Sequence, residues 1–122
     1  MNNSETSKVI FAQNIQQAAV SLQGENCDLA YSLIVEAMRI DPDAPQPHNL
    51  LGIFYELSGN GNLARRHYRA AYSLDPTYKP ACSNLERICT DFDNKPHTYD
   101  YGDLSEDLYA DAGKSKVKHN YT

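Results

Sequence analysis

Identical residues recur along this chain at a fixed offset of 34 positions. The recurring pairs are Ala30 with Ala64, Ala37 with Ala71, Asp41-Pro42 with Asp75-Pro76, and Leu51 with Leu85. A period of this size is typical of a helical hairpin that cannot bury its apolar face alone and stacks on copies of itself. The repeat therefore predicts an all-α superhelix of antiparallel helix pairs, an architecture that binds other molecules along its concave surface.

The second repeat, from Pro45 to Tyr78, carries a set of residues at characteristic spacings. They are Leu51, Gly52, Tyr55, Gly59, Ala64, Tyr68, Ala71 and Pro76. This pattern resembles the tetratricopeptide repeat, with His48 in the slot that the family often gives to tryptophan. The resemblance implies a right-handed superhelix in which the first helix of each unit lines the concave face.

The preceding repeat matches the family mainly in its second half. Gln17-Ala18 and Ser21 stand where Leu-Gly and Tyr are typical, and we expect the turn at 24–26 to be one residue longer than usual. The predicted organisation is a repeat domain at 1–95 and a C-terminal tail at 96–122. Within the domain, repeat one spans about 11–44, repeat two about 45–78, and a closing helix about 79–90.

Five helices are predicted, at about 6–23, 28–40, 46–58, 62–74 and 78–90. Ser4 or Ser7 is available to cap the first helix. Pro42 and Pro76 end the second and fourth helices, because proline lacks the backbone donor and clashes with the preceding turn. No stretch alternates with period two, so we expect no sheet.

Small residues are expected to bring the helices of each pair close together. Gly52, Ala64 and Ala71 carry no bulky side chain to separate two helix axes. Gly59-Asn60-Gly61 supplies the positive-φ residues that a tight interhelical turn needs. The second repeat therefore predicts a closely packed hairpin.

The composition changes near Asp91, where the repeat pattern stops. Residues 91–111 hold one lysine against seven acidic residues, and the tail contains four tyrosines: Tyr99, Tyr101, Tyr109 and Tyr121. Two hypotheses follow. The tail is a flexible acidic extension, or it packs onto the repeats or a neighbouring subunit as a cap, with a short helix at 105–113 and a cover made by Leu104, Leu108 and Tyr109.

Composition limits the classes of function. A net charge of −5 argues against a general nucleic-acid binder. No apolar run is long enough to cross a bilayer, and the first residues lack the apolar core of a signal peptide. Cys27, Cys82 and Cys89 have no metal-ligand spacing, so we expect reduced thiols, no metal and a cytoplasmic protein. The sequence contains no motif for an enzyme or a cofactor.

The candidate partner-binding groove consists of residues on the first, third and fifth helices. They are Ile15, Ala19, Leu22, Asn49, Ile53, Glu56, Ser83 and Arg87. The asparagine can satisfy a peptide backbone amide, and Arg87 can hold a carboxylate. At the positions where some tetratricopeptide domains clamp a C-terminal carboxylate, only Asn84 is of a suitable type, so we expect no such clamp. Ordinary solvated residues are the alternative interpretation.

One basic cluster, Arg65, Arg66 and Arg69, falls on the fourth predicted helix. It is either a solvated outer face or a candidate electrostatic patch for the acidic segment 91–111.

The predicted function is a non-enzymatic interaction module that binds a peptide or partner protein in its concave groove. The alternative is a small chaperone or structural subunit whose repeats and tail mediate self-association, for example as a homodimer. The two hypotheses differ in what covers the groove: a foreign peptide, a second copy, or the chain's own tail.

Overall fold

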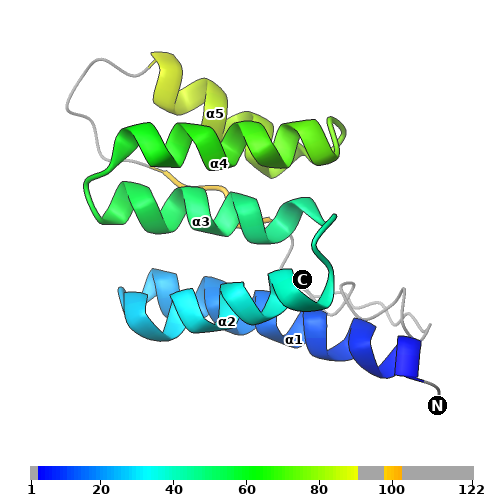
Figure 1. Ribbon diagram of the computed structural model, residues 1–122. Helices are drawn as coiled ribbons and strands as arrows, with labels where there is room; N and C mark the ends of the chain where they lie inside the picture. The colour runs from blue at the N-terminus through cyan, green and yellow to red at the C-terminus, as the bar shows by residue number, and fades with distance from the viewer. Residues whose placement is uncertain (1–2, 91–97, 103–122) are drawn as a thin grey trace, which may run out of the picture.

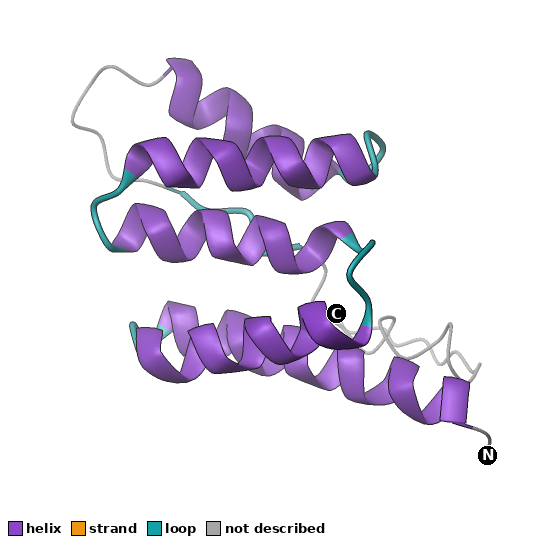
Figure 2. Ribbon diagram, in the orientation of Figure 1, coloured by secondary structure: helices purple, strands orange, loops and turns teal. Residues whose placement is uncertain are grey.

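The computed structural model of the protein describes residues 3–90 and 98–102. Over these residues the chain is all-α, with five helices and no strand (Figure 1 and Figure 2). The helices are α1 Asn3–Gln23, α2 Cys27–Ile40, α3 Pro45–Leu57, α4 Gly61–Leu74 and α5 Lys79–Thr90. The fold class and the helix order predicted from the repeat are therefore confirmed.

The predicted boundaries of α2 to α5 agree with the observed ones to within one residue. The first helix differs, because α1 already begins at Asn3. Ser4 and Ser7, the two expected caps, lie inside α1, so neither of them caps it.

The turns after α1 and α3 have the same backbone hydrogen bonds, 34 positions apart. Asn26 and Asn60 each donate their N–H to the carbonyl oxygen five residues earlier, at 2.8 Å in both turns. The residue before each asparagine has a positive φ, 59° at Glu25 and 81° at Gly59. This is the Schellman pattern that closes many helices. The two turns have equal lengths, so the expectation of a longer first turn is wrong.

The same two asparagines also begin the next helix. The side chain of Asn26 accepts the N–H of Leu29 at 3.3 Å, and that of Asn60 accepts the N–H of Leu63 at 3.1 Å. Such a cap typically contributes about 1 kcal/mol. Each hairpin is thus shaped by one asparagine that belongs to both the end of one helix and the start of the next.

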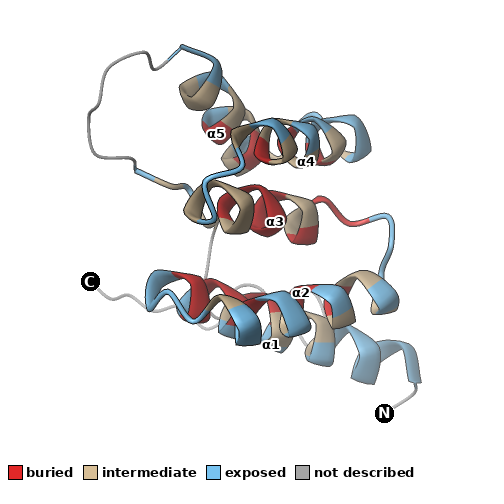
Figure 3. Ribbon diagram, turned by 60° about the vertical axis from the view of Figure 1, so that its left-hand side comes forward, coloured by how far each residue is buried: buried red, intermediate tan, exposed pale blue. Residues whose placement is uncertain are grey.

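The helices stack in pairs. Each helix packs against the next along the chain, and α3 also contacts α1 on one side and α5 on the other, whereas the α2 and α4 backbones do not meet. Helices α1, α3 and α5 therefore lie on the inner face of the stack, and α2 and α4 on the outer face (Figure 1). Helix α3 is the most buried of the five, because it contacts the α1/α2 hairpin on one side and α4 and α5 on the other (Figure 3).

The close approach of α3 and α4 depends on Gly52. A Cβ atom at this position would lie 2.2 Å from Cε1 of Tyr68, whose side chain is fully buried. The Tyr68 ring thus occupies the space that the Cβ atom of any other residue at position 52 would need. Ala64 and Ala71, the small residues of α4, are also fully buried.

Candidate functional site

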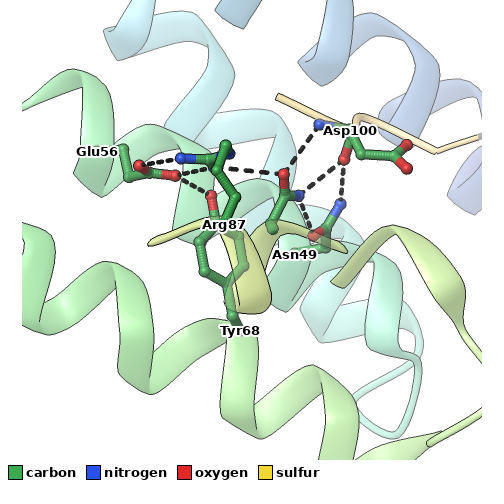
Figure 4. Close-up of polar contacts among 6 residues, drawn as sticks. Asn49, Glu56, Tyr68, Arg87 and Asp100 are labelled. Carbon is green, nitrogen blue, oxygen red and sulfur yellow. Dashed lines mark hydrogen bonds and ion pairs between the residues drawn. The ribbon is translucent and has the colours of Figure 1, made fainter. Parts of the chain in front are cut away.

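Residues 98–102 lie against the inner face of the stack, where Asp100 contacts both α3 and α5 (Figure 1). Nδ2 of Asn49 and Nδ2 of Asn84 both donate to the backbone carbonyl oxygen of Asp100, at 3.0 Å and 2.9 Å. The backbone N–H of Asp100 donates to Oδ1 of Asn84 at 2.9 Å. Side chains from two helices thus satisfy both main-chain polar groups of one residue (Figure 4).

The two asparagine side chains are buried and bonded to each other. Asn49 is 0% exposed and Asn84 is 1% exposed, and Nδ2 of Asn84 donates to Oδ1 of Asn49 at 2.8 Å. Each amide therefore uses both its oxygen and its nitrogen. Leaving a buried polar group unpaired costs about 1–3 kcal/mol. This pair, called the asparagine pair below, therefore has its own polar groups paired while it bonds both main-chain polar groups of Asp100.

Tyr99 and Tyr101 flank Asp100 and pack against the hydrophobic core. Side chains two positions apart in an extended segment share a face, so both rings face the helices while Asp100 stays exposed. The rings meet edge to face with centroids 6.3 Å apart, and the guanidinium of Arg87 lies 5.1 Å from the centroid of Tyr99, within cation–π range. Burial raises the pKa of both tyrosines, and the charge of Glu56 raises that of Tyr99 further.

Gly102 ends the segment in a conformation that favours glycine. Its φ is 93°, and a Cβ atom there would lie 2.6 Å from the hydroxyl oxygen of Tyr78. The exposed side chain of Asp100 accepts the N–H of Gly102 at 3.0 Å, a local turn typical of Asp and Asn. Two independent features thus require glycine at this position.

An ion pair lies beside the asparagine pair (Figure 4). Arg87 donates from Nη2 to Oε1 of Glu56 at 2.6 Å and from Nη1 to Oε2 at 2.9 Å, and Tyr68 donates its hydroxyl to Oε1 at 2.6 Å. The side chains of Glu56 and Arg87 are 6% and 17% exposed. The hydrogen bond from Arg87 to Glu56 raises the pKa of Arg87, and burial raises that of Tyr68. Arg87 is therefore charged and fixed in position beside Tyr99.

Three of the polar residues predicted for the groove belong to this site. Asn49 and Arg87 contact the segment 98–102, and Glu56 holds Arg87 in place. The expected use of Arg87 as a ligand for a partner's carboxylate does not match its position, because its bidentate partner is Glu56. Ser83, the fourth polar residue, is exposed on α5.

The four apolar residues predicted for the groove are part of the core. Ile15, Ala19, Leu22 and Ile53 are each at most 2% exposed. They do not form the open apolar wall that the sequence suggested, because they are packed in the core cluster between neighbouring helices. The inner face instead contacts the segment through Arg87 and the asparagine pair.

Asn84 is the functional residue that sequence reasoning missed. It was considered only as part of a carboxylate clamp, whereas in the structure it contacts a main-chain N–H and C=O. The available signal was its separation of 35 positions from Asn49, close to the repeat period.

The basic cluster lies on α4, away from the site on α3 and α5, and most of the residues on which the tail hypotheses depend are not described by the structure. Arg66 and Arg69 are exposed on α4, and Arg65 donates a hydrogen bond to Asn62. Most of the acidic segment 91–111 lies outside the described residues, and so does the whole of the expected helix at 105–113. The same holds for the expected cover, made by Leu104, Leu108 and Tyr109.

A second polar contact joins α3 to α4 through two histidines. Nδ1 of His48 lies 3.1 Å from Nδ1 of His67, and Tyr55 also stacks on His67 with ring centroids 5.3 Å apart. One of the two facing nitrogens has to donate and the other to accept, so at least one imidazole is neutral. Burial lowers the pKa of both histidines, and the neighbouring His48 lowers that of His67 further.

Neither a metal centre nor a membrane-spanning helix is found within residues 3–90 and 98–102. No group of three His, Cys, Asp or Glu side chains there is arranged to hold an ion. None of the helices described has the length and apolarity needed to cross a bilayer. The three cysteines are free thiols.

The chain was compared with protein-family models, with curated proteins and with solved structures, and no match was found in any of the three. The geometry of the site itself therefore carries the functional argument.

Proposed function

We propose that the inner face of α1, α3 and α5 binds an extended peptide segment of a partner protein, without catalysis. One observation carries this proposal: the buried asparagine pair hydrogen-bonds the main chain of Asp100 and leaves its side chain exposed. Every peptide offers the same N–H and C=O groups, so such a pair provides affinity that does not depend on the residue bound. Extended peptides are commonly recognised in this way, with side-chain subsites supplying specificity.

The residues around the asparagine pair are suited to selecting the side chains of a bound peptide. Two aromatic side chains are accommodated beside Asp100, and Glu56 holds the cation of Arg87 beside Tyr99 through hydrogen bonds that do not involve the ring. A preorganised site loses less entropy on binding, because fewer side chains have to be ordered. The likeness of the second repeat to tetratricopeptide repeats supports the same role, since the first helices of such arrays line the binding face.

The proposed setting is an adaptor or scaffold in the cytoplasm. Three free thiols are in keeping with a reducing compartment. The partner is a protein or peptide, and neither a cofactor nor a nucleic acid is part of the proposal.

A peptide selection tests the proposal. A library of random displayed peptides is selected against the full chain carrying Tyr99→Ser and Tyr101→Ser, which removes the aromatic anchors of the chain's own segment. The control adds Asn49→Leu and Asn84→Leu, which replaces both members of the asparagine pair with apolar groups of similar volume and so leaves no unpaired amide. Circular dichroism checks that both variants keep the helical content.

The proposal predicts enriched peptides whose affinity falls by about tenfold or more in the control, the size of a typical hot-spot loss. Enrichment no higher than with an empty support would contradict it. So would peptides that bind the control equally well, because the asparagine pair would then play no part.

A further inference from the structure

The segment Tyr99–Gly102 occupies the site that the proposed function assigns to a partner. Each of its four residues makes a different contact. Tyr99 lies beside Arg87, and the main chain of Asp100 bonds the asparagine pair. Tyr101 packs against the core, and Gly102 lies next to the Tyr78 hydroxyl. We propose that this segment is a built-in copy of the partner's recognition motif, aromatic–Asp–aromatic–Gly, and that it keeps the site closed until a partner segment displaces it. This inference rests on the proposed function and specifies its ligand.

The aromatic positions follow from what the rings contact. The Arg87 guanidinium lies over the ring of Tyr99, and the rings of Tyr99 and Tyr101 meet edge to face. An aliphatic residue would lose the cation–π attraction and the edge-to-face contact. Because extended residues two apart share a face, only a ligand with rings at both positions fills both subsites.

The second position is recognised through its main chain. Both asparagines bond the main chain of Asp100: Asn49 donates to its C=O, and Asn84 donates to the same C=O and accepts its N–H. Its carboxylate accepts the N–H of Gly102 instead, which favours the turn before the glycine. We therefore expect Asp or Asn at this position of the ligand, because either side chain stabilises the turn before the glycine in the unbound peptide.

The fourth position is the most selective. The Cβ atom of any other residue at position 102 would lie 2.6 Å from the Tyr78 hydroxyl oxygen. That residue would also have to adopt a φ of 93°, which is strained for every residue except glycine. Gly59 provides a matched comparison, since its φ is 81° but nothing lies within 4 Å of its missing Cβ. Substitution at Gly102 thus adds a steric clash to the backbone strain that both positions share.

The chain's own segment competes strongly because it is tethered. Only eight residues, 91–98, separate it from the last residue of α5. A short tether gives an effective local concentration on the order of millimolar. A partner segment of the same sequence therefore binds the wild-type chain much more weakly than a chain whose own segment cannot compete.

The test is a binding titration with a fluorescent synthetic peptide of residues 97–103, His-Thr-Tyr-Asp-Tyr-Gly-Asp. It is added to the full wild-type chain, to the chain with Tyr99→Ser and Tyr101→Ser, and to the chain with the single change Gly102→Ala. The second variant changes a single residue outside the helices, so it still gives a folded protein to compare if the first variant is poorly soluble. Gly59→Ala is the matched control for backbone strain away from the site.

We expect the peptide to bind both segment variants at least about tenfold more tightly than it binds the wild-type chain or Gly59→Ala. In the peptide, replacing glycine with alanine, or methylating the aspartate backbone nitrogen, weakens binding by about tenfold or more. Replacing the aspartate side chain with alanine costs less than about threefold, because only the local turn is affected.

Four results would overturn the inference. Equal affinity for the wild-type chain and the segment variants would show that the site is not held closed. Binding of library-selected peptides without binding of this one would refute the motif and leave the proposed function standing, whereas no binding of either would refute both. A wild-type dimer in light scattering that dissociates on Tyr99→Ser and Tyr101→Ser would make a second copy the occupant.

Discussion

Substituting Gly52 with alanine tests how the second hairpin is built. The new Cβ would lie 2.2 Å from Cε1, 2.4 Å from Cδ1 and 2.6 Å from Cζ of the Tyr68 ring. Carbon atoms pack at about 3.5–4.0 Å, so the ring has to retreat by more than about 1 Å. Tyr68 is fully buried, and its hydroxyl is bonded to Glu56 at 2.6 Å, so any retreat disturbs that bond as well.

Three contributions decide the size of the effect. Overpacking a core by one methyl group costs about 1–3 kcal/mol. Loss of a hydrogen bond to a charged group costs about 1.5–3 kcal/mol. Alanine recovers about 1 kcal/mol over glycine within a helix. We therefore expect Gly52→Ala to lower the free energy of unfolding by about 3 kcal/mol, a large share of the 5–15 kcal/mol typical of a domain.

Urea unfolding followed by circular dichroism measures this free energy. Gly61→Ala is the matched control, because the nearest atom to its added Cβ is Nη1 of Arg65 at 3.8 Å, an ordinary contact. We expect the control to be as stable as wild type or slightly more stable. If Gly52→Ala unfolds within about 0.5 kcal/mol of wild type, the range of ordinary surface changes, the close packing of α3 on Tyr68 is refuted.

Three further predictions concern charge and backbone strain. Arg87→Met leaves the buried carboxylate of Glu56 without its cation and should lower the free energy of unfolding by about 3 kcal/mol in urea titrations. Adding Glu56→Gln to this variant should recover part of the lost free energy, and no recovery would argue against the ion pair. The lowered pKa values of His48 and His67 mean that the folded state binds fewer protons than the unfolded chain, so their contribution to stability is fully present above the ordinary histidine pKa of 6.5 and is lost as the pH falls below it. A double substitution with phenylalanine should flatten the change in stability between pH 7 and pH 5 in thermal melts, and an unchanged slope would contradict this assignment. Glu25→Gly relieves a positive φ of 59° and should raise stability by up to about 1 kcal/mol, whereas a clear loss would show that the side chain is needed.

The 34-residue period was sufficient to predict the helices, because each signal acts locally. Asn26 and Asn60 shape their turns through bonds to residues within five positions. Pro42 and Pro76 each follow the capping aspartate at the end of α2 and α4. The extra residue expected in the first turn was wrong because Glu25 adopts the left-handed conformation that Gly59 adopts in the second turn. A non-glycine residue at that position hides the equivalence of the two turns.

The site was predictable only in part, because it depends on contacts between distant positions. Asn49 was placed on the inner face from the repeat, yet its partners Asn84 and Asp100 lie 35 and 51 positions further along the chain. Nothing local to Asp100 indicates which helices it will contact. Likewise, Arg87 is a plausible ligand for a partner until Glu56, on another helix, is seen to bind it.

The central claim is that the asparagine pair holds a peptide main chain, at present that of Asp100. Hydrogen exchange of the Asp100 backbone amide, followed by NMR on the full chain, tests this most directly. The N–H donates to Asn84 at 2.9 Å, so we expect exchange to be slowed by about tenfold or more relative to an unstructured peptide. The slowing should disappear in the Asn49→Leu and Asn84→Leu variant. Exchange of the wild-type Asp100 amide at the unstructured rate would contradict the account.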